Sequence, residues 1–175
     1  MMKPRDTLAG IRPGMTESQV LEQLGPPGPG GLGPLLDRVG DPLLASTSGR
    51  YYDRVLDRWL WQWAYFLPEN NLAVELEASR EAGPYVVRAV IGHGRGVHTD
   101  RGVEVGCSSA DVRAAYRDVV LEQLDHPHES VLVLRSGDLM FRFSGDGAGT
   151  IVLGTPSDWS ELTPATYPAP PRVMR

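Results

Sequence analysis

Apolar and polar residues alternate along several short stretches of the chain, and this period of two predicts half-buried β-strands. Turn-like segments rich in Gly, Pro, Asn and Asp separate the stretches. The expected strands are 57–67, 72–78, 85–91, 131–134, 139–143 and 150–153. Apolar residues four positions apart, such as Val20 and Leu24 or Val112 and Tyr116, predict one apolar stripe on each of two short helices. A further short helix is expected at 35–44.

The segments that begin these two helices share one pattern, 92 residues apart. Aligned without gaps, both have an apolar residue, a glycine, a hydroxyl residue and two further apolar residues in the same order. The matching pairs are Ile11 and Val103, Gly14 and Gly106, Thr16 and Ser108, Val20 and Val112, and Leu24 and Tyr116.

Both hydroxyl residues stand where a helix N-cap is expected. Thr16 is followed three positions later by Gln19, and Ser108 by Asp111, which is the spacing of a capping box. The glycine two positions before each cap is expected to permit a tight or left-handed turn into the cap.

Because each predicted helix is followed by a predicted meander, the chain is expected to belong to the α+β class. We expect two tandem helix-plus-antiparallel-meander repeats that form one continuous or closely packed sheet surface. The expected boundaries are 8–92 for the first repeat, with a Gly/Pro-rich insert at 25–33, 100–154 for the second repeat, and 155–175 for a Pro-rich tail.

The segment from Ile11 to Pro26, IRPGMTESQVLEQLGP, resembles the helix-start motif of two bacterial families. These are the β-lactamase inhibitor protein and the small lipoprotein of the outer-membrane assembly machinery. The resemblance implies short helices packed on a small antiparallel sheet, in tandem in the inhibitor protein, and a protein that grips another protein. The second segment departs from the motif at Cys107 and Arg117. One cysteine cannot form the internal disulfides that the inhibitor protein has. No partner is carried over, and no contact residue either, because the family's contact residues lie outside the motif that matches.

The stretch 57–67 places its aromatic residues on one side, and two orientations are open. The aromatic row either packs under the helix as core or is exposed as a binding surface, because Trp and Tyr are frequent in interface hot spots. The neighbouring strands favour core for Trp61, and Phe141 and Phe143 are expected to be core in the second repeat. The opposite, outer sheet face is then the predicted partner-binding surface, with two tryptophans at its rim or at the seam between the repeats. The predicted partner-binding residues are Gln62, Glu75, Glu77, Arg88, Arg142, Trp59 and Trp63.

An alternative function is a small hydrolase or metal protein centred on His93, His98 and Asp100. These residues lie in the Gly-rich segment 92–101, where no helix would hold two imidazoles on one face. The chain also lacks paired catalytic carboxylates, a nucleophile elbow and a dinucleotide fingerprint. We therefore predict no catalytic residue, no metal ligand and no cofactor, and a chain that is not an enzyme.

Composition narrows the class of partner. Among 175 residues, 22 acidic side chains exceed 17 basic ones, which argues against a nucleic-acid partner. No stretch has the roughly 20 apolar residues of a membrane helix, and no secretory signal is visible, so we expect a cytoplasmic protein without membrane contact. An envelope or secreted protein remains the alternative if an export signal has been trimmed, and the oligomeric state stays open. The sequence thus predicts a non-enzymatic bacterial module that binds another protein as an inhibitor, an immunity partner or an assembly adaptor.

Overall fold

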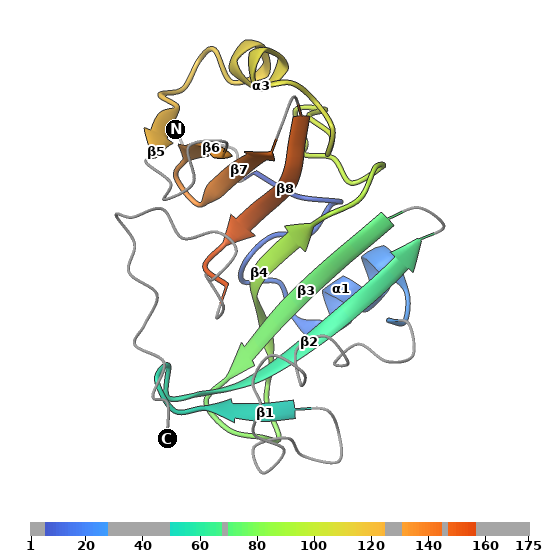
Figure 1. Ribbon diagram of the computed structural model, residues 1–175. Coiled ribbons are helices and arrows are strands. Elements are labelled where there is room, and N and C mark those ends of the chain that lie inside the picture. Colours follow the sequence, from blue (N-terminus) through green and yellow to red (C-terminus); the bar gives the residue numbers. More distant parts are fainter. Residues whose placement is uncertain (1–5, 28–49, 68–69, 125–130, 145–146, 157–175) are drawn as a thin grey trace.

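A computed structural model describes residues 6–27, 50–67, 70–124, 131–144 and 147–156. Its elements form one eight-stranded antiparallel sheet with two helices (Figure 1). In chain order they are α1 (Glu17–Leu24), β1 (Arg50–Asp53), β2 (Arg58–Leu67), β3 (Asn70–Ala78), β4 (Val86–Gly92), α3 (Ser109–Ala115), β5 (Glu122–Leu124), β6 (Val131–Ser136), β7 (Leu139–Ser144) and β8 (Gly147–Gly154). None of the helices in these ranges is long and apolar enough to cross a membrane.

The strands follow the order β1-β2-β3-β4-β8-β7-β6-β5. Each helix is therefore followed by strands that pair with their chain neighbours, and the last strands of the two series, β4 and β8, pair at the centre. The predicted α+β class with an antiparallel sheet is confirmed, and the sheet is continuous. Below, residues 8–92 are called the first half and residues 100–154 the second half.

Six of the eight strands overlap the expected ranges, and the two outermost strands were not expected. β1 has four residues and β5 has three, which is too short for an alternating pattern to be recognised. Both are held by pairing with a longer neighbour, β2 or β6. The helix expected at 35–44, most of the insert 25–33 and most of the tail 155–175 lie outside the described residues.

Both predicted capping boxes are present. The Gln19 side chain accepts from the backbone N–H of Thr16 (2.9 Å), and the Thr16 hydroxyl accepts from the N–H of Gln19 (3.4 Å). Ser108 and Asp111 make the same two bonds at 3.0 and 3.2 Å. These bonds satisfy N–H groups that the first helical turn leaves unpaired.

The residues just before each cap pair with the last strand of the same half. Gly14, at φ +87°, donates to the Val87 carbonyl (2.8 Å), and the Val87 N–H donates to the Met15 carbonyl (2.7 Å). Such a positive φ favours glycine, as expected from the sequence. In the second half Gly106, at φ +105°, donates to the Ala148 carbonyl, and the Ala148 N–H donates to the Cys107 carbonyl, both at 2.8 Å.

The sulfur atoms next to the caps also occupy equivalent places. The Arg12 N–H points to the Met15 sulfur at 3.3 Å, and the Glu104 N–H to the Cys107 sulfur at 3.4 Å. Both sulfur side chains are partly buried against the main core. Cys107 therefore packs as an apolar residue, in the position that Met15 has in the first half.

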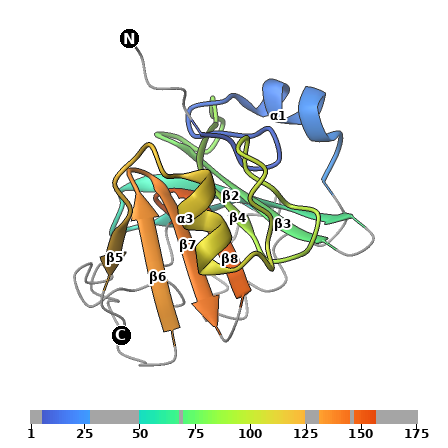
Figure 2. The same ribbon diagram turned by 90° about the horizontal axis from the view of Figure 1, so that it is seen from above.

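One hydrophobic core joins the two halves. Val20 of α1 and Val112 of α3 are fully buried in the same cluster as side chains from β2, β3, β4, β6, β7 and β8. In the view from above, α3 lies over β7 and β8 (Figure 2), where the rings of Tyr116 and Phe141 meet at 5.4 Å. Both helices thus cover the same face of the sheet, which we call the inner face. The opposite face is the outer face.

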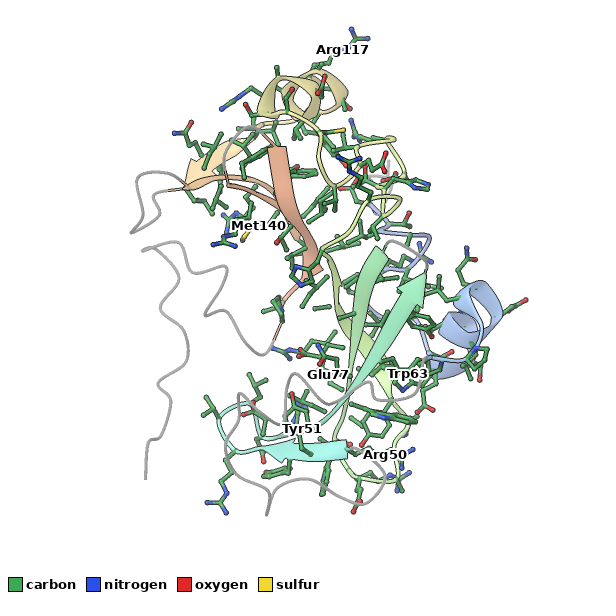
Figure 3. The ribbon with its side chains drawn as sticks, turned by 45° about the vertical axis from the view of Figure 1, so that its right-hand side comes forward. Arg50, Tyr51, Trp63, Glu77, Arg117 and Met140 are labelled. Carbon is green, nitrogen blue, oxygen red and sulfur yellow. The ribbon has the colours of Figure 1, made fainter. Side chains whose placement is uncertain are left out.

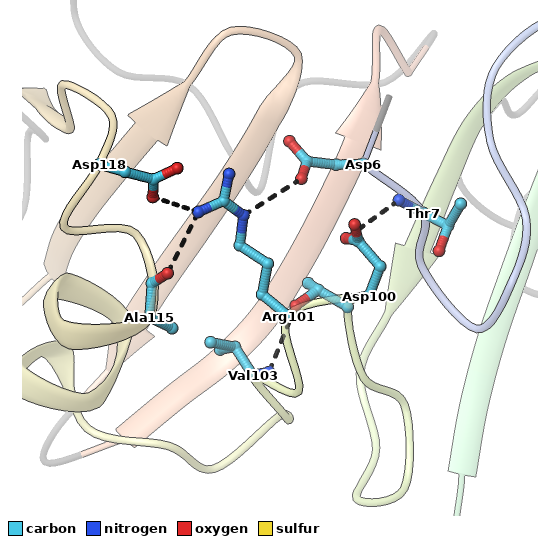
Figure 4. A network of polar contacts seen from close by, with 8 residues as sticks. Asp6, Thr7, Asp100, Arg101, Val103, Ala115 and Asp118 are labelled. Carbon is cyan, nitrogen blue, oxygen red and sulfur yellow. Dashed lines mark hydrogen bonds and ion pairs between the residues drawn. The ribbon is translucent and has the colours of Figure 1, made fainter. Parts of the chain in front are cut away.

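Arg101 connects the N-terminal segment to the end of α3 (Figure 4). Its guanidinium donates to the Ala115 carbonyl (3.2 Å) and to Asp118, and it lies 3.9 Å from the carboxylate of Asp6. The hydrogen bond from Arg101 lowers the pKa of Asp118, whereas burial and then the nearby Asp100 carboxylate raise the pKa of Asp6. The network fixes the chain on either side of the second helix.

Candidate protein-binding face

The polar residues predicted for the outer face of the first half lie together there. Gln62 and Glu75 are cross-strand neighbours in β2 and β3. Arg88 of β4 reaches both acidic side chains of β3, with nitrogen–oxygen distances of 2.6 Å to Glu77 and 3.6 Å to Glu75. Glu77 and Met140 lie on the side of the sheet away from α1, whereas Trp63 lies on the side of α1 (Figure 3). The prediction that these polar residues share the face opposite the tryptophans is confirmed.

The three charged residues Glu75, Glu77 and Arg88 differ in how far they are buried, and this decides which of them can contact a partner. Glu75 is only 2% exposed and the Arg88 side chain 16% exposed, while the Glu77 side chain is 27% exposed. Glu75 is therefore a buried acid held by Arg88, and not the solvated contact residue that the alternation suggested. Gln62, Glu77 and Arg88 are the half-buried members that a partner can reach.

The tryptophans of β2 belong to the inner face. Trp63 is 4% exposed, sits opposite Val74, and meets Trp61 edge to face at 5.0 Å. The expectation that Trp63 lies at an exposed rim or seam is thus wrong, because the indole is enclosed by the core beneath α1. Trp61 packs against this core under the Arg50 guanidinium, which is 4.3 Å from its ring, as the core interpretation predicted. Trp59 is half-buried at the far end of the same row.

A β-bulge occurs at the same place in each half. Between β3 and β4 the register shifts after Glu75, and between β7 and β8 it shifts after Arg142. In each case one residue of the last strand has no partner across the bulge, Arg88 in β4 and Gly149 in β8. Glu75 and Arg142 thus each stand just before a register shift, and Arg88 and Gly149 are each the extra residue of a bulge.

The central strand pair places the two bulges symmetrically. Ile91 faces Val152 across β4 and β8, and the extra residues of the bulges, Arg88 and Gly149, stand three positions before Ile91 and Val152 respectively. Glu75 lies on one side of the pair Ile91–Val152 and Arg142 on the other.

The outer face of the second half is apolar around this pair. Val133, Met140 and Val152 form a second buried cluster, and Ile91 and Leu124 pack against it half-buried. This cluster was not predicted. The signal for it was the uninterrupted apolar run in each strand, such as 151–153, which is typical of strands buried on both faces.

Arg142 stands beside this cluster, opposite Val133 in β6 and Thr150 in β8. Its side chain is half-buried, and its Nε atom is buried without a hydrogen-bond partner in the described part of the chain. The expectation that Arg142 faces outward while Phe141 and Phe143 are core is confirmed.

Comparisons with protein-family models, curated proteins and solved structures found no match. The functional argument accordingly rests on the geometry of these residues.

The residues of the alternative hydrolytic or metal site contact three different parts of the molecule. His93 Nδ1 lies 3.3 Å from the Thr150 hydroxyl, and His98 Nδ1 lies 3.1 Å from the Gly96 carbonyl. The Asp100 carboxylate accepts from the Thr7 N–H at 3.4 Å. Within the described ranges, no group of three or more His, Cys, Asp and Glu side chains is arranged to hold a metal ion.

Proposed function

We propose that this chain is a non-enzymatic protein-binding module built from two copies of one helix-plus-meander unit. The equivalent hydrogen bonds before the two caps, 92 residues apart, support the two copies. The two bulges, whose extra residues Arg88 and Gly149 stand three positions before the paired Ile91 and Val152, support them independently. Two similar units joined through their last strands give one binding surface twice as wide as that of a single unit.

The outer face of the shared sheet is the proposed binding surface. Its accessible part combines half-buried charged and polar side chains with half-buried apolar ones beside a buried apolar cluster. Protein interfaces have this composition, with an apolar centre, a polar rim and an enrichment in arginine. The observation that carries the proposal is that both described helices lie on the inner face, so that side chains from both halves meet on the outer one. The accessible residues are Gln62, Glu77, Arg88, Ile91, Leu124 and Arg142.

The class of partner follows from the resemblance of the first helix-start segment and from the charge of the chain. An inhibitor, immunity or assembly-adaptor protein binds another protein, and the net charge of −5 disfavours nucleic acid as the alternative polymer.

The test is affinity capture from an extract of the native source with the immobilised full chain, followed by mass spectrometry and calorimetry with the purified partner. Glu77→Arg places a charge reversal on the outer face, and Glu22→Arg places the same reversal on the exposed side of α1. We expect the dissociation constant to rise at least about tenfold for Glu77→Arg and to stay unchanged for Glu22→Arg. The proposal fails if no partner is captured by the folded chain, or if both variants bind the partner as the unchanged protein does.

A further inference from the structure

The two halves carry different charges just before their register shifts on the outer face. In the first half the residue at the bulge is Glu75, and the extra residue of the last strand, Arg88, supplies the opposite charge at 3.6 Å. In the second half the residue at the bulge is Arg142, and the extra residue is Gly149, which has no side chain to supply one. The second half therefore has a cation where the first half has a compensated anion.

No carboxylate among the described residues compensates Arg142. Glu122 of β5, an acid of this half, is engaged by Arg135 of β6. Across the sheet Arg142 has Val133 on one side and Thr150 on the other. A half-buried guanidinium with a buried, unbonded Nε is costly to the free chain, because its lost hydration is not replaced.

We propose that Arg142 binds a carboxylate of the protein partner, an Asp or Glu side chain flanked by apolar residues. A planar guanidinium matches a carboxylate with two parallel hydrogen bonds, which are stronger than neutral ones. The apolar neighbours of that acid pack on the half-buried Ile91 and Leu124 beside the Val133 cluster. The proposal rests on the outer face being the binding surface, and it names the chemistry of one contact there.

Nuclear magnetic resonance of the full chain, with ¹⁵N-labelled arginine, tests the contact directly. The probes are two peptides, acetyl-Leu-Glu-Leu-amide and acetyl-Leu-Gln-Leu-amide, which differ only in the carboxylate. We expect the Glu peptide to shift the Nε–Hε resonance of Arg142 saturably, with an affinity at least about tenfold higher than that of the Gln peptide, since a charge-assisted hydrogen bond outweighs a neutral one. The Arg88 resonance is expected to stay in place, because that guanidinium is already paired.

Matched variants separate the contact from general charge attraction. Arg142→Gln removes the cation on the outer face, and Arg117→Gln removes one from the exposed helix side, where Figure 3 shows Arg117 pointing away from the sheet. Binding of the Glu peptide should be lost in the first variant and retained in the second. Arg142→Lys keeps the charge without the planar fork, so its affinity should fall severalfold with the fold intact.

Three results would overturn the inference. They are equal binding of the two peptides, no saturable shift at millimolar concentration, or unchanged binding by Arg142→Gln. A shift of the Arg142 resonance with protein concentration alone would assign the site to a second copy of this chain and overturn it too. In each of these cases the proposed function would still stand if Glu77→Arg weakens binding of the captured partner. Failure of the Arg142 contact and failure of the proposed function are therefore distinguishable.

Thermal unfolding is a second test, because replacing an arginine that stabilises the free chain would not raise its melting temperature. Arg142→Met replaces an uncompensated guanidinium by an apolar chain of similar length beside Val133 and Met140. We expect the melting temperature of the free chain to rise by about 2–4 °C, because the desolvation cost disappears. A fall of similar size would show that Arg142 stabilises the free chain and would contradict the inference.

Discussion

Replacing Arg88 by methionine removes the guanidinium that faces Glu75 at 3.6 Å, at a position where the carboxylate is 2% exposed. Removing one partner of a buried ion pair costs about 3–5 kcal/mol. The Arg88 side chain keeps 16% of its surface exposed and its contact with Glu75 is longer than a hydrogen bond, so we expect about 2 kcal/mol. For a chain of this size that loss corresponds to a melting temperature lower by about 4–8 °C. Urea unfolding followed by tryptophan fluorescence measures it, since Trp61 and Trp63 pack at the core.

The controls use the same cluster. Glu77→Gln removes the more exposed acid, whose side chain is 27% exposed, and should cost less than about 1 kcal/mol. The double variant Glu75→Gln, Arg88→Met should be more stable than the sum of its single variants predicts, by about 1 kcal/mol or more, because no charge is left buried. Additivity within about 0.3 kcal/mol, or equal costs for Arg88→Met and Glu77→Gln, would refute the reasoning that Arg88 serves mainly to hold the buried Glu75.

Three further predictions concern the fold. Val20→Ala and Val112→Ala each remove a fully buried side chain from the one shared core, so each should lower the unfolding free energy by about 2 kcal/mol while fluorescence and circular dichroism still show one coincident transition. Gly106→Ala forces a Cβ onto a residue at φ +105° and should cost about 1–2 kcal/mol by urea unfolding, although open space surrounds the site; no cost would argue against the left-handed turn. Because Arg101 lowers the pKa of Asp118 below 3.8, the stabilisation is present above that pH and is lost as pH falls through the folded-state pKa. Asp118→Asn should therefore be less stable than the unchanged protein at pH 7, with a difference that shrinks as the pH falls below 3.8, and a difference independent of pH in urea unfolding would contradict this.

The local sequence was sufficient to predict the features that depend only on residues a few positions apart in the chain. The capping boxes at Thr16 and Ser108 depend on residues three positions away, and the left-handed glycines on their own backbone freedom. The alternation of β2 was sufficient to separate Gln62 from the tryptophans, because side chains of a strand alternate between the faces whatever it pairs with. For the same reason Arg142 was correctly placed outward.

The pairing of strands distant in the sequence decided which side chains make up the outer face and which of them are accessible. The edge strands β1 and β5 exist only through their neighbours, and the central β4–β8 pair joins residues about 60 positions apart. The bulges belong to the β3–β4 and β7–β8 pairings, and they place Arg88 beside Glu75 in the first half but Gly149 in the second half, where Arg142 has no counter-ion among the described side chains. Burial is likewise a property of the assembled sheet, so the sequence could assign Glu75 and Trp63 to a face but could not show that both are enclosed. Composition and periodicity thus determined which side chains share a surface, and long-range packing determined which of them a partner can reach.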